Sequence, residues 1–118
     1  MQPIEFVSRR KSLGLSQGDL GALFDPPVKQ ATIAHWERGA RPIPPGIDGA
    51  LATLEAMQDD ITESMQDLVE QSSTGTVELV LPLSNAGKLP LDFQGVAAAR
   101  ALRDARYQGM TIRIADTR

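Results

Sequence analysis

Residues 10–45 contain the pattern that most restricts how this chain can fold: two short amphipathic helices separated by a break with two prolines. Ser16 can cap the first helix, and Asp25-Pro26-Pro27 ends it, because a residue that precedes proline disfavours the α conformation. The apolar residues of this helix recur at the i, i+3, i+4 spacing of one buried face: Leu20, Leu23 and Phe24. The pattern predicts a helix-turn-helix unit.

The second helix of the pair is predicted to begin at residue 28 or 29 and to end at 38, with Gly39 as its left-handed cap. At ~100° per residue, Ile33 and Trp36 fall on one side together with Lys29. The opposite arc carries short and polar side chains: Gln30, Ala31, Ala34, His35 and Arg38. A merely solvated helix more often carries Glu and Lys there. The arc is therefore interpreted as a surface that can lie in the major groove of DNA and approach base edges.

Two further helices are predicted around this pair, over residues 3–13 and 46–71, and residues 72–75 read as a linker. The apolar residues of the long helix follow a four-three spacing in which Gln58 fills the missing position: Ile47, Leu51, Leu54, Ile61, Met65 and Leu68. We therefore predict a mainly α fold with a DNA-binding domain over 1–71.

The remaining segment, residues 77–118, is predicted to form a small β-α-β region. Strands are expected over 77–83 and 110–114, and a helix over 93–107 with Asp92 as its cap. Two short strands and one helix rarely bury enough apolar surface alone, so we predict that this region dimerises with a second copy. The residues assigned to dimerisation are Val77, Leu79, Leu81, Val96, Met110, Ile112 and Ile114. The alternative is that this region packs on the 46–71 helix of its own chain.

Charge is distributed unevenly along the 118 residues, whose net charge is −3. Residues 1–46 hold six bases and four acids, residues 47–76 hold seven acids and no base, and residues 77–118 hold six bases and four acids. The acidity is confined to one segment, so the mildly basic ends can meet phosphate.

Composition excludes several classes of protein. The absence of cysteine excludes disulfides and thiolate metal sites, and one histidine makes a histidine-based metal centre unexpected. No apolar run approaches the ~18 residues of a membrane span. We therefore expect a cytoplasmic protein that needs no metal or cofactor, and the lack of a paired-acid pocket disfavours an enzyme.

Residues 10–44 resemble the lambda-repressor-like helix-turn-helix of the Xre/Cro family. The matching residues are Leu13-Gly14-Leu15-Ser16-Gln17, Leu20, Leu23, Thr32-Ile33, Trp36-Glu37, Gly39 and Arg41-Pro42. The turn over residues 25–29 departs from the family, because it is longer than usual and contains two prolines. The resemblance implies a bundle in which Gln17 contacts phosphate and Arg10 pairs with Glu37.

A smaller subgroup is also similar to this chain: the regulators associated with anti-CRISPR operons and their YdiL-like relatives. The shared features are the longer turn, the Ile-Pro-Pro at residues 43–45 and the Val96-Ala97-Ala98 helix. Members of that subgroup pair an N-terminal DNA reader with a C-terminal dimerisation region and repress their own operon.

Individual roles follow from side-chain chemistry. Gln30 is the first candidate for base reading, because its amide can pair bidentately with adenine, which is worth ~1–3 kcal/mol of discrimination. Ala31 and Ala34 can contact thymine methyls or simply allow close approach, and His35 can donate to guanine or phosphate. The predicted phosphate contacts are Gln17, Lys29, Thr32, Arg38 and Arg41. Thr32 also suits packing on the helix surface, and the stem of Lys29 can lie over the core.

Together these features predict a homodimeric DNA-binding regulator that occupies an inverted-repeat operator and represses its own operon. Two alternatives remain open. The first is an antitoxin that binds a toxin and also represses, and the second is a regulator that binds RNA.

Overall fold

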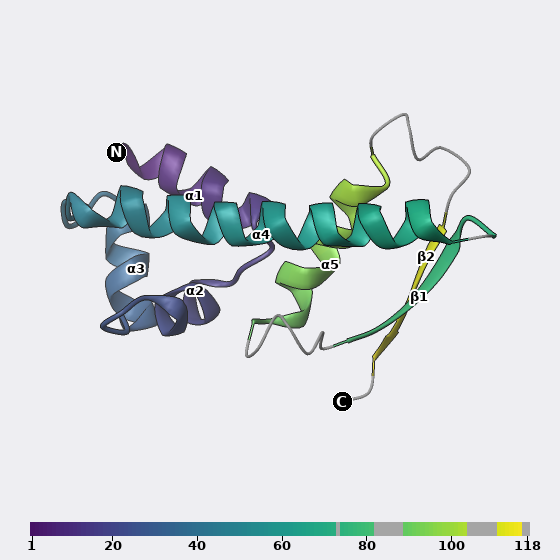
Figure 1. Ribbon diagram of the computed structural model, residues 1–118. Coiled ribbons are helices and arrows are strands. Elements are labelled where there is room, and N and C mark those ends of the chain that lie inside the picture. The colour runs from purple at the N-terminus through teal and green to yellow at the C-terminus, as the bar shows by residue number, and fades with distance from the viewer. Residues whose placement is uncertain (73, 82–88, 104–110, 117–118) are drawn as a thin grey trace. The chain divides into compact units, whose positions relative to one another are not determined.

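The computed structural model describes residues 1–72, 74–81, 89–103 and 111–116 (Figure 1). The elements in chain order are α1 (Pro3–Ser12), α2 (Gln17–Leu23), α3 (Gln30–Glu37), α4 (Gly46–Gln71), β1 (Thr76–Leu81), α5 (Leu91–Ala101) and β2 (Thr111–Asp116). The predicted mainly helical class is confirmed. The chain forms two compact units, Met1–Glu55 and Ala56–Arg118. This division falls inside α4, whereas the sequence pattern suggests one in the linker after residue 71.

The limits of the first three helices coincide with local sequence signals. Pro3 occupies the first turn of α1, where its missing N–H costs nothing. The Ser16 hydroxyl accepts a hydrogen bond of 3.1 Å from the Asp19 amide, which confirms the predicted cap of α2. Gly39 follows α3 with a φ of 74°, the left-handed conformation that glycine adopts freely.

The core of the first unit is apolar and well packed. Ile33 is fully buried and Trp36 is 5% exposed, so α3 is anchored by the two residues that the helical pattern assigns to its inner side. The rings of Phe6 and Trp36 meet edge to face, with centroids 5.9 Å apart. The other buried apolar residues of this unit are Leu13, Leu15, Leu20, Phe24, Leu51 and Leu54. Burial of each large side chain contributes roughly 1.5–3 kcal/mol.

Gly21 allows the turn after α2 to approach that helix closely. Its carbonyl oxygen accepts a 2.9 Å hydrogen bond from the Val28 amide, and a Cβ at Gly21 would overlap the Val28 carbonyl oxygen. The Ile33 Cδ1 would also lie only 3.1 Å from that Cβ. The long, proline-containing turn is therefore held against α2.

The second half of α4 and α5 are joined by side chains that donate to main-chain carbonyl oxygens. Gln58 Nε2 donates to the Phe93 oxygen at 3.1 Å, Thr62 Oγ1 to Ala97 at 3.2 Å and Gln66 Nε2 to Ala101 at 3.1 Å. Donors and acceptors both advance by four residues, so one face of α4 follows one face of α5. We call these three hydrogen bonds the carbonyl ladder.

The apolar stripe of α4 departs from the predicted spacing near its end. Leu68 is 45% exposed, whereas Val69 is 1% exposed and takes its place in the core. The strict seven-residue spacing was therefore wrong here, because a straight helix has 3.6 residues per turn and its buried side drifts away from a repeat of 3.5.

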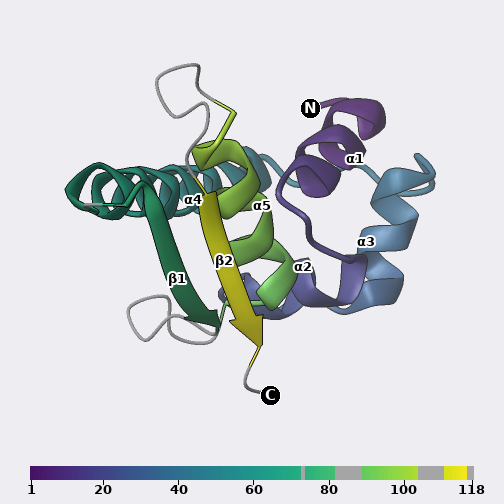
Figure 2. The same ribbon diagram turned by 90° about the vertical axis from the view of Figure 1, so that its right-hand side faces the viewer.

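The strands β1 and β2 are parallel and lie side by side (Figure 2). Thr76 pairs with Thr111 and Leu81 with Asp116 at the two ends of the register. The helix between them begins at Leu91 with Pro90 as its N-cap, and not after Asp92 as predicted. Pro90 has a φ of −57° and a ψ of 148°, so its backbone is not helical and the helix can begin at the next residue. α5 ends at Ala101, earlier than predicted, and the predicted helical residues 104–107 lie outside the described residues.

Candidate nucleic-acid interface

The helix α3 presents two different sides. Ile33 and Trp36 are buried, whereas Gln30 and Ala31 in its first turn are exposed. Ala34 and His35 are half-buried, so all four predicted base-reading side chains are at least partly accessible. The first amides of a helix have no partner within it, so the start of α3 offers N–H groups next to Gln30.

His35 and Arg38 lie one turn apart and form a hydrogen bond. The distance from Arg38 Nη2 to His35 Nδ1 is 3.1 Å. Arginine can only donate, so Nδ1 must accept, and a neutral imidazole then carries its proton on Nε2. This tautomer makes Nε2 a donor for an acceptor atom such as a phosphate oxygen or guanine O6 or N7.

Glu37, the last residue of α3, accepts hydrogen bonds from polar side chains of α1 and α2. Arg10 donates to both of its carboxylate oxygens, at 2.6 and 3.0 Å, which confirms the ion pair that the family resemblance implies. Arg10 also donates to the Leu15 oxygen at 3.0 Å, and Gln17 Nε2 donates to Glu37 at 3.0 Å. Desolvation by burial favours the neutral form of Glu37, but the hydrogen bonds from Arg10 and Gln17 outweigh it and lower the pKa of Glu37.

Gln17 therefore has a role that the sequence pattern missed. It was predicted as a phosphate contact, and the structure places its amide on Glu37, half-buried at the start of α2. Gln17 thus ties the start of α2 to the end of α3. A side-chain amide has a second N–H, so a phosphate contact by Gln17 stays a prediction.

The other predicted phosphate contacts are positioned as follows. Lys29, Arg38 and Arg41 are exposed and make no ion pair within the described part of the chain. Thr32 is half-buried, and its amide donates to the Lys29 oxygen at 3.0 Å. Three cations near the two ends of α3 are thus accessible to an anionic partner.

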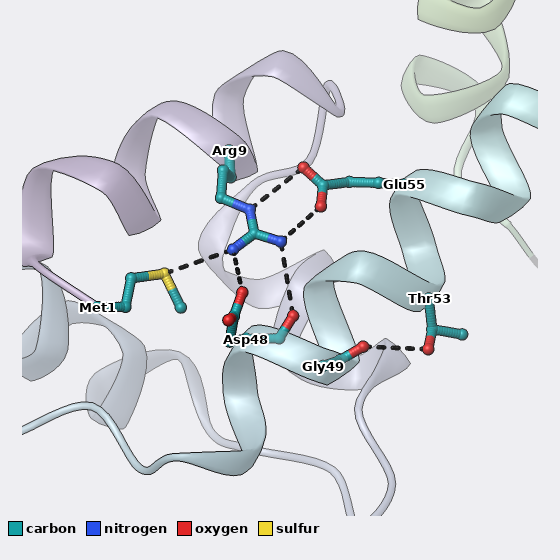
Figure 3. A network of polar contacts seen from close by, with 6 residues as sticks. All are labelled: Met1, Arg9, Asp48, Gly49, Thr53 and Glu55. Carbon is teal, nitrogen blue, oxygen red and sulfur yellow. Dashed lines mark hydrogen bonds and ion pairs between the residues drawn. The ribbon is translucent and has the colours of Figure 1, made fainter.

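A second arginine, Arg9, joins α1 to the beginning of α4, and no sequence pattern predicted this contact. Its guanidinium donates to Glu55 at 2.5 and 3.2 Å and to the Asp48 carboxylate at 2.5 Å (Figure 3). Hydrogen bonds from Glu55 and then Asp48 raise the pKa of Arg9 further above its usual value. Asp48 and Glu55 are two helical turns apart, and this spacing on one face is the signal that could have indicated a shared partner.

The predicted dimerisation residues lie in or next to the second unit's strands and helix. Val77, Val96 and Ile112 are half-buried. Leu79, Leu81 and Ile114 belong to β1 and β2, but their side chains lie outside the described part of the structure, as does the whole of Met110.

In the described ranges of the chain, no group of three or more acidic or histidine residues could hold a metal ion. The same ranges contain no helix with the length and apolar character needed to cross a bilayer. No protein-family model and no curated protein matches this chain.

Proposed function

We propose that this protein is a sequence-specific DNA-binding regulator that uses α3 as its reading helix. The observation that carries the proposal is the division of α3 between a buried side, Ile33 and Trp36, and an accessible side headed by Gln30. The major groove of DNA is about 12 Å wide and admits one α-helix. Because Ile33 and Trp36 anchor α3 in the core, its opposite side can enter that groove while the helix stays packed.

The chemistry of the accessible side suits bases and phosphates. Gln30 supplies an amide, which pairs with the N6 and N7 atoms of adenine. Ala31 next to it is too small to keep the helix away from the base edges. Lys29, Arg38 and Arg41 supply cations for the flanking phosphates. These features, together with the resemblance to the lambda-repressor-like helix-turn-helix, support DNA as the partner.

We further propose that the protein acts as a homodimer through its second unit. Within the described residues, the sheet consists of β1 and β2 alone, and the two are parallel. Parallel sheets usually have more strands and are covered on both faces, so a parallel pair this small gains stability if a second copy extends it. Dimerisation would present two α3 helices to successive major grooves, ~34 Å apart, on an inverted-repeat operator.

Selection from a random duplex library tests the proposed function directly. The full-length protein should enrich one inverted repeat, and its mass in solution should be that of a dimer. Failure to enrich any sequence at low salt would refute sequence-specific binding. A monomeric mass with an enriched single half-site would refute only the dimer.

Lys29→Ala separates phosphate contacts from base contacts. Loss of this cation should weaken binding to selected and random duplexes by similar factors, and should reduce the slope of log K against log salt by about one. Glu5→Gln provides a control at an exposed position in α1. An unchanged salt slope in Lys29→Ala would exclude Lys29 from the interface.

Repression of its own operon is the regulatory outcome we propose. A dimer bound over its own promoter would obstruct polymerase, and no chemical step is required. A reporter fused to the upstream region of this gene should lose expression when the protein is supplied, and it should regain expression with a binding-deficient variant.

A further inference from the structure

A groove of about 400 Å³ opens in the first unit beside α3. It lies between the turn after α2 and the first turns of α4. Its walls are mostly apolar and include Phe24, Val28, Trp36, Ile47 and Ala50. A concave apolar site of a few hundred Å³ with few polar groups is the usual form of a small-molecule site.

One ionisable residue lines the groove. Asp25 is the only ionisable residue among the described residues that line it, and its side chain belongs to an exposed residue at the turn. Trp36 lines the same groove with the small part of its side chain that is not buried, since this residue is 5% exposed. One acidic residue on otherwise apolar walls favours a ligand that is apolar along its body and positive at one end.

We propose that this groove binds an amphipathic organic cation, such as an arylalkylamine. The apolar body of the ligand lies along Val28, Ile47 and Ala50, and its ammonium group faces the Asp25 carboxylate. A neutral ligand of the same shape keeps the apolar contacts and loses the charge interaction. An anion of the same shape faces repulsion from Asp25. The groove thus discriminates by charge as well as by shape.

This site would make the DNA-binding unit responsive to a ligand. Its walls include the turn that Gly21 holds in place and the tryptophan that anchors α3. A ligand that contacts both can change the equilibrium between arrangements of α3 only as far as it binds one arrangement better. The binding proposal does not depend on DNA recognition, because it rests on the groove alone.

Intrinsic fluorescence measures occupancy of the groove, since Trp36 is the only tryptophan in the sequence. The full-length protein should be titrated with phenylbutylamine, phenylbutanol and phenylbutyrate, which share a body and differ in charge. We expect a saturable change in Trp36 emission with the amine at the lowest concentration, about fivefold below the alcohol, because an exposed ion pair contributes up to ~1 kcal/mol. The carboxylate should bind most weakly. The absence of a saturable change with the amine, or equal affinities for the three compounds, would overturn the proposal.

Two variants locate the site. Asp25→Asn should reduce affinity for phenylbutylamine to that for phenylbutanol, whereas Asp60→Asn, an exposed aspartate outside the groove lining, should leave the preference intact. Ala50→Phe should fill the groove and abolish the response to all three compounds. Circular dichroism and thermal unfolding check that each variant is folded. A preference that survives in folded Asp25→Asn, or undiminished binding by folded Ala50→Phe, would place the ligand elsewhere and contradict the proposal.

DNA binding measured on the same samples keeps the two proposals distinguishable. Protein that enriches an operator but ignores the amine disproves the groove site alone. Protein that binds the amine with the expected charge preference but enriches no sequence disproves the DNA-binding function alone.

Discussion

In the first unit, arginine side chains join helices that are distant in the sequence, whereas in the second unit the repeated contacts between α4 and α5 come from uncharged side chains of α4 that donate to main-chain oxygens of α5. One ion pair, between Arg100 and Asp59 at 2.8 Å, also joins these two helices, and its side chains are 40% and 61% exposed. Arg9 bridges α1 to α4 and Arg10 bridges α1 to α3. The carbonyl ladder instead repeats one kind of contact at Gln58, Thr62 and Gln66. Ion pairs weaken with salt and with protonation of the carboxylate, and amide-to-carbonyl bonds do neither. Because the exposed Arg100–Asp59 pair contributes little, the first unit should respond to salt and pH more strongly than the second.

Gly21→Ala should have the largest effect, because the new Cβ would overlap a backbone oxygen that no rotamer change can move. We expect a loss of about 3 kcal/mol or more in the free energy of unfolding of the first unit, measured by Trp36 fluorescence in denaturant. Gly18→Ala in the same helix is the matched control, because a Cβ there meets no atom within 4 Å. It should stabilise the protein by ~0.5–1 kcal/mol. Equal effects of the two substitutions would contradict the close approach of turn and helix.

Gln58→Ala should have the next largest effect, and it acts on the second unit. This side chain is fully buried, donates to the Phe93 oxygen and accepts from Arg100 Nη1 at 2.9 Å. Its removal leaves a cavity and takes away the partner of the Phe93 oxygen and of Arg100 Nη1, at a cost of about 2–3 kcal/mol. Hydrogen exchange of the α5 amides should become faster. Gln71→Ala, at the exposed end of α4, should leave α5 exchange unchanged, and similar exchange in both variants would argue against the ladder.

Glu37→Gln should cost about 2 kcal/mol near neutral pH, because it removes the charge that Arg10 and Gln17 hold in a half-buried place. The pKa of Glu37 is lowered in the folded protein, so its contribution is complete above the unfolded-state value of 4.5 and is lost as pH falls through the folded-state pKa. The wild-type protein should therefore lose stability on acidification below this value more steeply than the variant. Parallel stability curves below pH 4.5 would show that Glu37 is not the group concerned.

Arg9→Met should have the smallest effect, about 1 kcal/mol or less, because Asp48 is 71% exposed and water screens the pair. The difference from wild type should shrink as salt rises, while the effect of Gln58→Ala should stay constant. This contrast in salt dependence is the sharpest test of the difference between the two units. A constant Arg9→Met effect across salt would mean that lost packing, and not charge, explains it.

The sequence predicted the first four helices well, because their limits depend on local signals. Pro3, Ser16 and Gly39 each act on the backbone beside them, and the helical period alone placed Ile33 and Trp36 in the core. Those same two residues imply which side of α3 remains accessible. The predicted face of α3 could thus be derived before any tertiary contact was known.

Contacts between distant residues could not be derived in this way. Arg9 meets Asp48 and Glu55 only because α1 packs on α4, and Gln17 reaches Glu37 only because α2 and α3 are held at a particular angle. Val69, and not Leu68, is buried in the core. A seven-residue pattern does not predict this, because the buried side of a helix with 3.6 residues per turn drifts away from a repeat of 3.5. Gln17 was predicted to contact DNA because the sequence pattern does not show its hydrogen bond to Glu37.

The accessible side of α3 is the central claim, and the ratio of affinities for selected and scrambled duplexes in Gln30→Ala tests it most directly. Loss of the amide should reduce affinity for the selected duplex by about five- to hundredfold, corresponding to ~1–3 kcal/mol, while affinity for the scrambled duplex changes little. The ratio should therefore fall by nearly the same factor. An unchanged ratio, with both affinities reduced equally or not at all, would contradict base reading by α3.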